Sequence, residues 1–252
     1  MKLFHRSLAL VLVACIAASA SAAPKEKEKE KEHEGKLVDS GSFGVFQNGN
    51  RVGTEKFSIY QTGSGSVIDS EFRTENSPTP AVQTSAMQLT ANGEVRRYEW
   101  KEISPGSAES VIVPANDFLS QKWRATPQEK EHEKPYLMPA STSILDDYFF
   151  VHRELLAWKF IAMTCSKQAN GLVQCPPRQR IQFATLNPHE QASSALSAES
   201  LGREKVVLKG GVQELNKLEF KNDAGTWNLW LDDQWKVIRM SVVGEHTEVD
   251  RD

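Results

Sequence analysis

Short runs of alternating apolar and polar residues, separated by turn-forming residues, dominate this chain. Between residues 67 and 74, Ile68 and Phe72 alternate with charged residues, as in a strand with one face in a core and the other in water. Asn48-Gly49-Asn50 and Asn92-Gly93 accept positive φ angles and predict hairpin turns. The chain is therefore expected to be mainly antiparallel β-sheet.

The same pattern predicts a series of strands along the chain. The first strands are predicted at residues 41–46, 52–60, 67–74, 82–89, 95–100, 110–113 and 118–124. The strand pattern returns at residues 180–183 and continues at 206–208, 214–220, 226–231 and 237–243. Residues 126–139 contain three prolines and several charges, which predicts a loop that crosses the sheet edge.

One helix interrupts the strands. Ser143 and Asp146 match a capping box, and Ile144, Tyr148 and Val151 begin a helical spacing of apolar residues. We expect this helix to span about residues 143–163.

Many antiparallel strands with a single long helix predict a mainly β fold. We expect an antiparallel curved sheet or partly closed β-barrel, with the helix packed on or in it. An α/β fold would need helices between the strands, and the pattern predicts none. Residues 41–252 are expected to form one domain.

The first 22 residues resemble a secretory signal peptide, with a basic start, an apolar run and a small-residue exit at Ala20-Ser21-Ala22. The protein is therefore expected to be exported, to the periplasm or beyond the cell. Residues 12–15 also fit a lipoprotein cleavage pattern, in which Cys15 would carry the lipid and anchor the protein to the outer membrane. Residues 23–40 are charged and low in complexity, which predicts a solvated spacer.

Cleavage near Ala22 would leave the mature chain with Cys165 and Cys175. In an oxidising compartment we expect them to form a structural disulfide across a turn at Asn170-Gly171. A redox-active pair would more often have the CxxC spacing, which is absent.

Composition and motifs exclude several functions. The residues are 39% hydrophobic and 25% charged with a formal net charge of -3, so no basic footprint for nucleic acid is expected. The histidines are scattered, without a metal-binding or nucleophile motif, so no metal, no cofactor and no catalytic residue is predicted. The two acidic pairs, at residues 146–147 and 232–233, are interpreted first as capping and turn residues.

Aromatic residues are the stronger functional signal. Trp230 points opposite to Leu229 and Leu231 in a regular strand, so either both faces of that strand are covered or Trp230 lines a surface or cavity. A concave sheet with the helix as a plug suits an acyl chain. The candidate ligand-binding residues are Tyr148, Phe149, His152 and Trp230.

Three segments carry a family resemblance: GVFQNGNRVGT at residues 44–54, LDDYFF at 145–150 and LWLDD at 229–233. They resemble the exported bacterial domain-of-unknown-function 3108 family. The resemblance implies a β-rich envelope protein, broadly similar to the periplasmic half-barrel carriers of lipids and lipoproteins. It implies no catalytic residue.

Three functional hypotheses follow. The first is a non-enzymatic exported binder of an apolar or amphipathic, lipid-like ligand, which needs an apolar cavity that reaches solvent beside the helix. The second is a structural or protein-interaction module with a filled core and an envelope protein as its partner. The third is a hydrolase, which needs a histidine, an acid and a nucleophile in one cleft. A membrane is an expected partner only if Cys15 is lipidated.

Overall fold

A computed structural model describes residues 35–169 and 173–252. The described residues belong to one compact unit, His33–Asp252. The predicted signal peptide, Cys15, residues 23–34 of the predicted spacer and the turn at Asn170-Gly171 lie outside the described residues.

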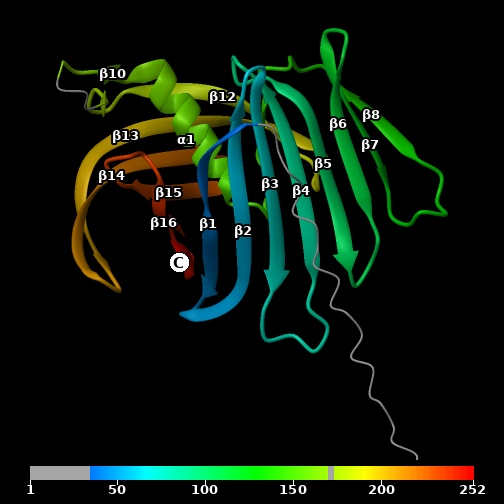
Figure 1. Cartoon of the computed structure of the whole chain (residues 1–252), viewed down its shortest axis with the longest axis horizontal. Coiled ribbons are helices and arrows are strands. Elements are labelled where there is room, and N and C mark those ends of the chain that lie inside the picture. The colour runs from blue at the N-terminus through cyan, green and yellow to red at the C-terminus, as the bar shows by residue number, and fades with distance from the viewer. Residues whose placement is uncertain (1–34, 170–172) are drawn as a thin grey trace, which may run out of the picture. The chain divides into compact units, whose positions relative to one another are not determined.

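The first eight strands form an antiparallel meander, in which each strand pairs with the next along the chain (Figure 1). They are β1 (Lys36–Gln47), β2 (Asn50–Thr62), β3 (Gly65–Thr74), β4 (Val82–Thr90), β5 (Val95–Ser104), β6 (Glu109–Ala115), β7 (Phe118–Arg124) and β8 (His132–Tyr136).

The later strands form a second antiparallel run, which joins the first where β17 pairs with β1. They are β12 (Arg180–Asn187), β13 (Ala192–Leu208), β14 (Gly211–Asn222), β15 (Gly225–Leu231), β16 (Val237–Val242) and β17 (Thr247–Arg251). The short strand β9 (Ser143–Ile144) adds to β12 in parallel. The result is a 15-stranded sheet with β8 and β9 at its edges.

The predicted fold class is confirmed. The strands are mainly antiparallel and curve around the helix α1 (Val151–Thr164), which lies along the concave side of the sheet (Figure 1). Along β2 and β3, alternate side chains are buried in the core that includes the helix, and the side chains between them are more exposed.

Several strands differ from the prediction. The short strands β9, β10 (Ser166–Lys167) and β11 (Val173–Gln174) were not predicted, and β13 begins at Ala192, although only its last residues, 206–208, were predicted. β17 was not predicted, although it joins the two halves of the sheet through β1 and β16. β8 lies within the expected loop at residues 126–139 and pairs with β7. β1 begins at Lys36, inside the expected spacer, because Lys36 and Leu37 pair with the end of β2.

The helix begins at Val151, later than predicted, and ends at Thr164. The capping-box prediction is wrong because Ser143 belongs to β9, where it pairs with Thr185. Asp146 instead accepts a hydrogen bond from the N–H of Tyr148, which closes a turn before the helix. The apolar spacing from Ile144 therefore continues through a strand and a turn before the helix starts.

The space between the sheet and α1 is filled. One hydrophobic cluster joins residues of both halves of the sheet to the helix. Its largest fully buried side chains include Phe43, Tyr98, Phe149, Phe160 and Phe220. A core packed in this way has few voids larger than a water molecule, so a ligand has to bind in a surface hollow.

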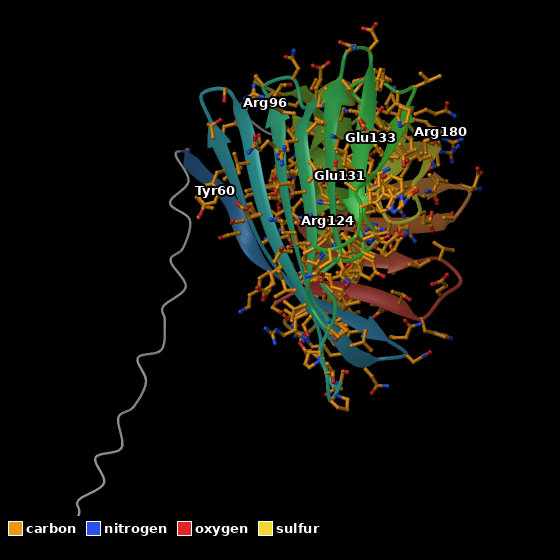
Figure 2. All side chains as sticks on the ribbon, turned by 90° about the vertical axis from the view of Figure 1, so that its right-hand side faces the viewer. Tyr60, Arg96, Arg124, Glu131, Glu133 and Arg180 are labelled. Carbon is orange, nitrogen blue, oxygen red and sulfur yellow. A yellow bond between two sulfur atoms is a disulfide. The ribbon has the colours of Figure 1, made fainter. Side chains whose placement is uncertain are left out.

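The edge of the sheet at β8 carries charged side chains. Glu131 and Glu133 lie 3.3 and 3.9 Å from Lys122 Nζ, and Arg124 Nε donates to Glu109 Oε1 at 2.5 Å. Arg124, Glu131 and Glu133 lie on the side of the protein that faces the viewer in Figure 2. Charges and the Pro135 ring on an edge strand disfavour pairing with another sheet.

Cys165 and Cys175 form the predicted disulfide. It follows directly on the end of α1 and encloses the two-stranded ladder of β10 (Ser166–Lys167) and β11 (Val173–Gln174). Among the described residues, no helix is long and apolar enough to cross a membrane.

Candidate functional site

The first turn of α1 is held by a carboxylate from a distant strand. The N–H groups of Phe150 and Val151 donate to Glu55 Oε2 at 2.7 and 3.2 Å. The Ser70 hydroxyl donates to Glu55 Oε1 at 2.6 Å. Burial raises the pKa of Glu55 to about 7, although these donors oppose the shift. Glu55 in β2 is therefore the cap that the sequence pattern placed at Ser143.

Asp146 ties the turn before α1 to the sheet. Its Oδ1 accepts the N–H of Tyr148 at 2.9 Å, and its Oδ2 accepts the hydroxyl of Tyr98 in β5. His189 Nε2, from the turn between β12 and β13, lies 2.9 Å from the same Oδ2 as an ion contact without an aligned hydrogen bond. Burial alone would raise the pKa of Asp146. His189, the nearby His152 and the Tyr98 hydroxyl together outweigh burial and lower this pKa. Asp146 is thus an ionised anchor.

His152 is a neutral residue of the core. The N–H of Asp146 donates to its Nδ1 at 3.3 Å, so the ring proton belongs on Nε2. Burial lowers the pKa of His152 to about 4, which keeps the ring uncharged at neutral pH. In the described part of the chain, Nε2 has no hydrogen-bond partner.

The opposite side of α1 carries a second buried polar cluster. Arg251 Nη2 lies 2.8 Å from both Glu154 Oε2 and Asp39 Oδ2, so one guanidinium serves two buried carboxylates. Lys236 Nζ contacts Asp39 Oδ1 at 2.7 Å. Burial raises the pKa of Glu154 to about 8 although Arg251 opposes the shift. Burial would also raise the pKa of Asp39, but its hydrogen bonds to Arg251 and Lys236 lower it.

Because of Glu55 and Glu154, the free energy of unfolding should fall as pH rises from about 4.5 to 8, and above about pH 6.5 His152 no longer opposes this fall. The folded chain keeps protons on Glu55 and Glu154 that the unfolded chain releases near pH 4.5, so their stabilising contribution is complete below that pH and is lost through about 7 and 8. The low pKa of His152 makes the free energy of unfolding rise with pH, but only between about pH 4 and 6.5. Each glutamate should contribute a slope of about 1 kcal/mol per pH unit within its range.

Urea unfolding at pH 6.5, 7.5 and 8.5 measures this slope. The Glu154→Gln variant, which cannot ionise, should show a shallower slope than the wild type. Equal slopes in the two proteins, or stability that rises with pH, would contradict the assignment.

The hydrolase hypothesis requires an acid, a histidine and a nucleophile in one cleft. Asp146 and His189 meet the requirement for a close acid and histidine. The hydrogen bonds of the described residues include none between His152 or His189 and a serine, threonine or cysteine side chain. The arrangement positions the start of α1, and the hydrolase hypothesis gains no nucleophile from it.

A hollow of about 430 Å³, here named the α1 groove, lies beside the second half of the helix. Most of its lining is apolar. It is formed by Val38 of β1, by Trp158, Ile161 and Ala162 of α1, and by Gln234, Trp235 and Lys236 of the turn after β15. Its volume falls within the range of small-molecule sites, about 300–1,000 Å³.

Hydrogen bonds hold the two tryptophans of the groove in place. Trp158 Nε1 donates to the carbonyl oxygen of Trp235 at 2.6 Å. Trp235 has a φ of 63°, in the left-handed region that a bulky residue rarely adopts. The carboxylate of Asp232 maintains the turn by accepting the N–H groups of Gln234 at 2.8 Å and Lys236 at 2.9 Å. Asp232 is thus the turn residue that the sequence predicted.

The four predicted ligand-binding residues occupy two places. Tyr148 is 40% exposed, whereas Phe149 and His152 are buried beside it at the start of α1. Trp230 packs with Val206 and Leu215 in a separate cluster on the other face of the sheet. Both faces of β15 are therefore covered, and none of the four residues is part of the lining of the α1 groove.

Sequence reasoning missed the charged residues that position the helix: Asp39, Glu55, Arg153, Glu154, His189 and Arg251. Only Glu55 left a signal, since it is in phase with the core-facing Phe57 and Ile59 of β2.

Comparisons with known proteins do not assign this chain to a family. No family model matches the chain. No curated protein matches it either. A solved structure of a DUF1089 family protein from Pseudomonas aeruginosa is 11% identical, with 76% of this chain and 90% of that chain covered and a TM-score of 0.42. A likeness at this level carries no argument, and the relation to the domain-of-unknown-function 3108 family stays a prediction.

Proposed function

We propose that this protein is exported and binds an amphipathic, lipid-like ligand in the α1 groove without catalysing a reaction. The observation that carries the proposal is a largely apolar hollow that is open to solvent beside α1. The binder hypothesis asked for an apolar cavity that reaches solvent beside the helix; this hollow lies beside α1 and is open to solvent, but it is a surface feature outside the filled core. The Cys165–Cys175 disulfide supports export, because disulfides persist in oxidising compartments.

The chemistry of the groove suits a molecule with an apolar chain and an acidic head. Trp158, Ile161 and Trp235 offer rigid apolar surface to the chain. The ammonium group of Lys236 has three donors and uses one on Asp39, so it can pair with an acidic head. The unfavourable backbone conformation of Trp235 also fits a binding role, since such conformations cluster at ligand sites.

Ligand binding should be lost when a charge is placed in the groove. Ala162→Glu puts a carboxylate on an exposed position of the lining, where it meets the apolar chain and repels an acidic head. We expect affinity for a probe such as oleate to fall about tenfold or more, a change of about 1.4 kcal/mol per decade. Quenching of tryptophan fluorescence in delipidated protein measures the affinity.

Met163→Glu is the matched control. Met163 is the next residue of the same helix, is 63% exposed and is not part of the groove lining. The affinity of the Met163→Glu variant for oleate should be within about twofold of that of the wild type, since surface substitutions away from a site have small effects. Equal losses in the two variants, or no saturable binding by the wild type, would refute the groove as the site.

The filled core favours a second candidate, a protein-interaction module of the cell envelope. Leu137 follows the edge strand β8 and is 95% exposed, which suits contact with a partner chain. Native mass spectrometry of protein purified from the host envelope separates the candidates. A lipid-range mass that mild organic extraction removes supports the binder, and a bare mass, less two hydrogens for the disulfide, supports the module.

A further inference from the structure

A second hollow, here named the Arg153 cleft, has a volume of about 260 Å³ and lies where α1 begins. Asp147 and Arg153 contribute to it from the turn and the first turn of the helix. Glu190 lies in the turn before β13, Asp223 in the turn after β14, and Trp227 in β15. The cleft shares no lining residue with the α1 groove.

The guanidinium of Arg153 is fixed in the wall of this cleft. Its side chain is 4% exposed. Its Cζ lies 4.1 Å from the ring centroid of Trp227 and 5.4 Å from that of Phe150, so aromatic rings hold it in position. Its Nη1 donates to the carbonyl oxygen of Asp146 at 3.3 Å.

Most donors of Arg153 remain without an acceptor. A guanidinium has five N–H donors, and in the described residues the bond to Asp146 is its one hydrogen bond. Asp147 Oδ1 lies 3.6 Å from Nη2, an ion contact beyond hydrogen-bonding distance. A buried cation with free donors beside a cleft matches a carboxylate or phosphate, which guanidinium groups bind through two parallel hydrogen bonds.

The rest of the lining carries the opposite charge. Asp147, Glu190 and Asp223 are acidic residues of the same cleft, and Asn187 Nδ2 orients Asp147 by donating to its Oδ2 at 2.5 Å. A simple anion would be repelled by these carboxylates, and a simple cation would be repelled by Arg153. A molecule with both charges satisfies both groups.

We propose that the Arg153 cleft binds a small zwitterion. Its oxyanion pairs with Arg153, its ammonium group faces Asp147, Glu190 and Asp223, and its body packs against Trp227. A free α-amino acid has this chemistry, and so does the phosphoethanolamine head of a lipid. The site is separate from the α1 groove, and either can fail without the other.

Calorimetric titration of the wild type with four probes tests the charge requirement. L-leucine carries both charges, N-acetyl-L-leucine lacks the ammonium group, L-leucinamide lacks the carboxylate, and O-phosphoethanolamine represents the lipid head. Leucine or phosphoethanolamine should bind saturably, and the tighter of the two shows whether the ligand is a free amino acid or a lipid head group. Both single-charge probes should bind about tenfold or more weakly than leucine. Equal binding of N-acetyl-leucine and leucine, or no binding by either zwitterion, overturns the proposal.

Variants locate the site. Arg153→Gln should abolish binding, and because the residue is buried, its fold has to be checked by circular dichroism. Glu190→Gln and Asp223→Asn change exposed residues, and each should weaken binding of the zwitterion about fivefold. Neither should weaken binding of N-acetyl-leucine, because an anion is repelled by these carboxylates. Asp233→Asn, an exposed aspartate outside the cleft, is the matched control and should bind like the wild type. Unchanged binding in both exposed cleft variants contradicts the assigned ammonium site.

Discussion

Glu55→Ala should lower the free energy of unfolding by about 3–5 kcal/mol, because it leaves buried donors of α1 and β3 without an acceptor. The N–H groups of Phe150 and Val151 and the hydroxyl of Ser70 all donate to this carboxylate. The positive charge of Arg153 also loses a buried counter-charge. Urea unfolding at pH 7 measures the loss. Hydrogen exchange of the amides at residues 150–155 should show a frayed first turn of α1.

Glu204→Ala is the matched control for this prediction. Glu204 lies 2.7 Å from Lys217 Nζ, but its side chain is 44% exposed. An exposed ion pair contributes about 0–1 kcal/mol, so this variant should be nearly as stable as the wild type. If Glu55→Ala loses no more than this control, Glu55 does not cap the helix. Glu55→Gln keeps one acceptor oxygen, so its loss of unfolding free energy should lie between those of Glu55→Ala and Glu204→Ala.

Glu55 shows how far the sequence pattern reaches. The alternation that predicted β2 places Gly53, Glu55, Phe57 and Ile59 on one face, and the structure buries all four. The pattern therefore placed a carboxylate in the core. It could not place the partner, because the first turn of α1 is 95 residues away along the chain and meets Glu55 only when the sheet has curved.

Local signals misplaced the start of the helix for a related reason. Ser143 and Asp146 have the spacing of a capping box, but both have stronger partners in the fold. Ser143 joins β12 as a parallel strand, and Asp146 binds Tyr98 and contacts His189. A helix cap stabilises by about 0.5–2 kcal/mol, whereas removing the partners of a buried charge such as Asp146 costs about 3–5 kcal/mol. Tertiary contacts therefore set the boundary of α1.

The end of the chain was harder to predict than its middle. Residues 247–251 alternate threonine and valine with charged residues, and no apolar run marks a strand. They form β17 because they fill the gap between β1 and β16, and this brings Arg251 beside Glu154 and Asp39. Asp39 lies in the segment expected to be a solvated spacer. Because neither β17 nor the start of β1 was predicted, the ion network of Asp39, Glu154 and Arg251 was not predicted either. Its members are far apart in the sequence.

That network is the basis of the second large effect. Arg251→Met should lower the free energy of unfolding by about 3–5 kcal/mol, because the nearly inaccessible Asp39 would lose a counter-charge and the buried Glu154 would lose a hydrogen-bond donor. Methionine keeps much of the packing against Phe43 and Phe57, over which the guanidinium lies. Urea unfolding measures the loss.

Arg203→Met separates burial from the number of ion pairs. Arg203 also contacts two carboxylates, Asp233 at 2.7 Å and Glu214 at 3.5 Å, but its side chain is 41% exposed. Its replacement should cost about 1 kcal/mol or less. Equal losses at the two arginines would mean that the buried network contributes no more than a surface pair.

The loss at Arg251 should also depend on pH. Above its pKa of about 8, Glu154 of the wild type releases its proton beside Arg251, whereas in Arg251→Met it has to keep the proton or remain as an unpaired buried charge. The difference in stability between the two proteins should therefore be larger at pH 9 than at pH 7. A difference that stays constant over this range would show that Arg251 stabilises the fold by packing, with its charge playing no part.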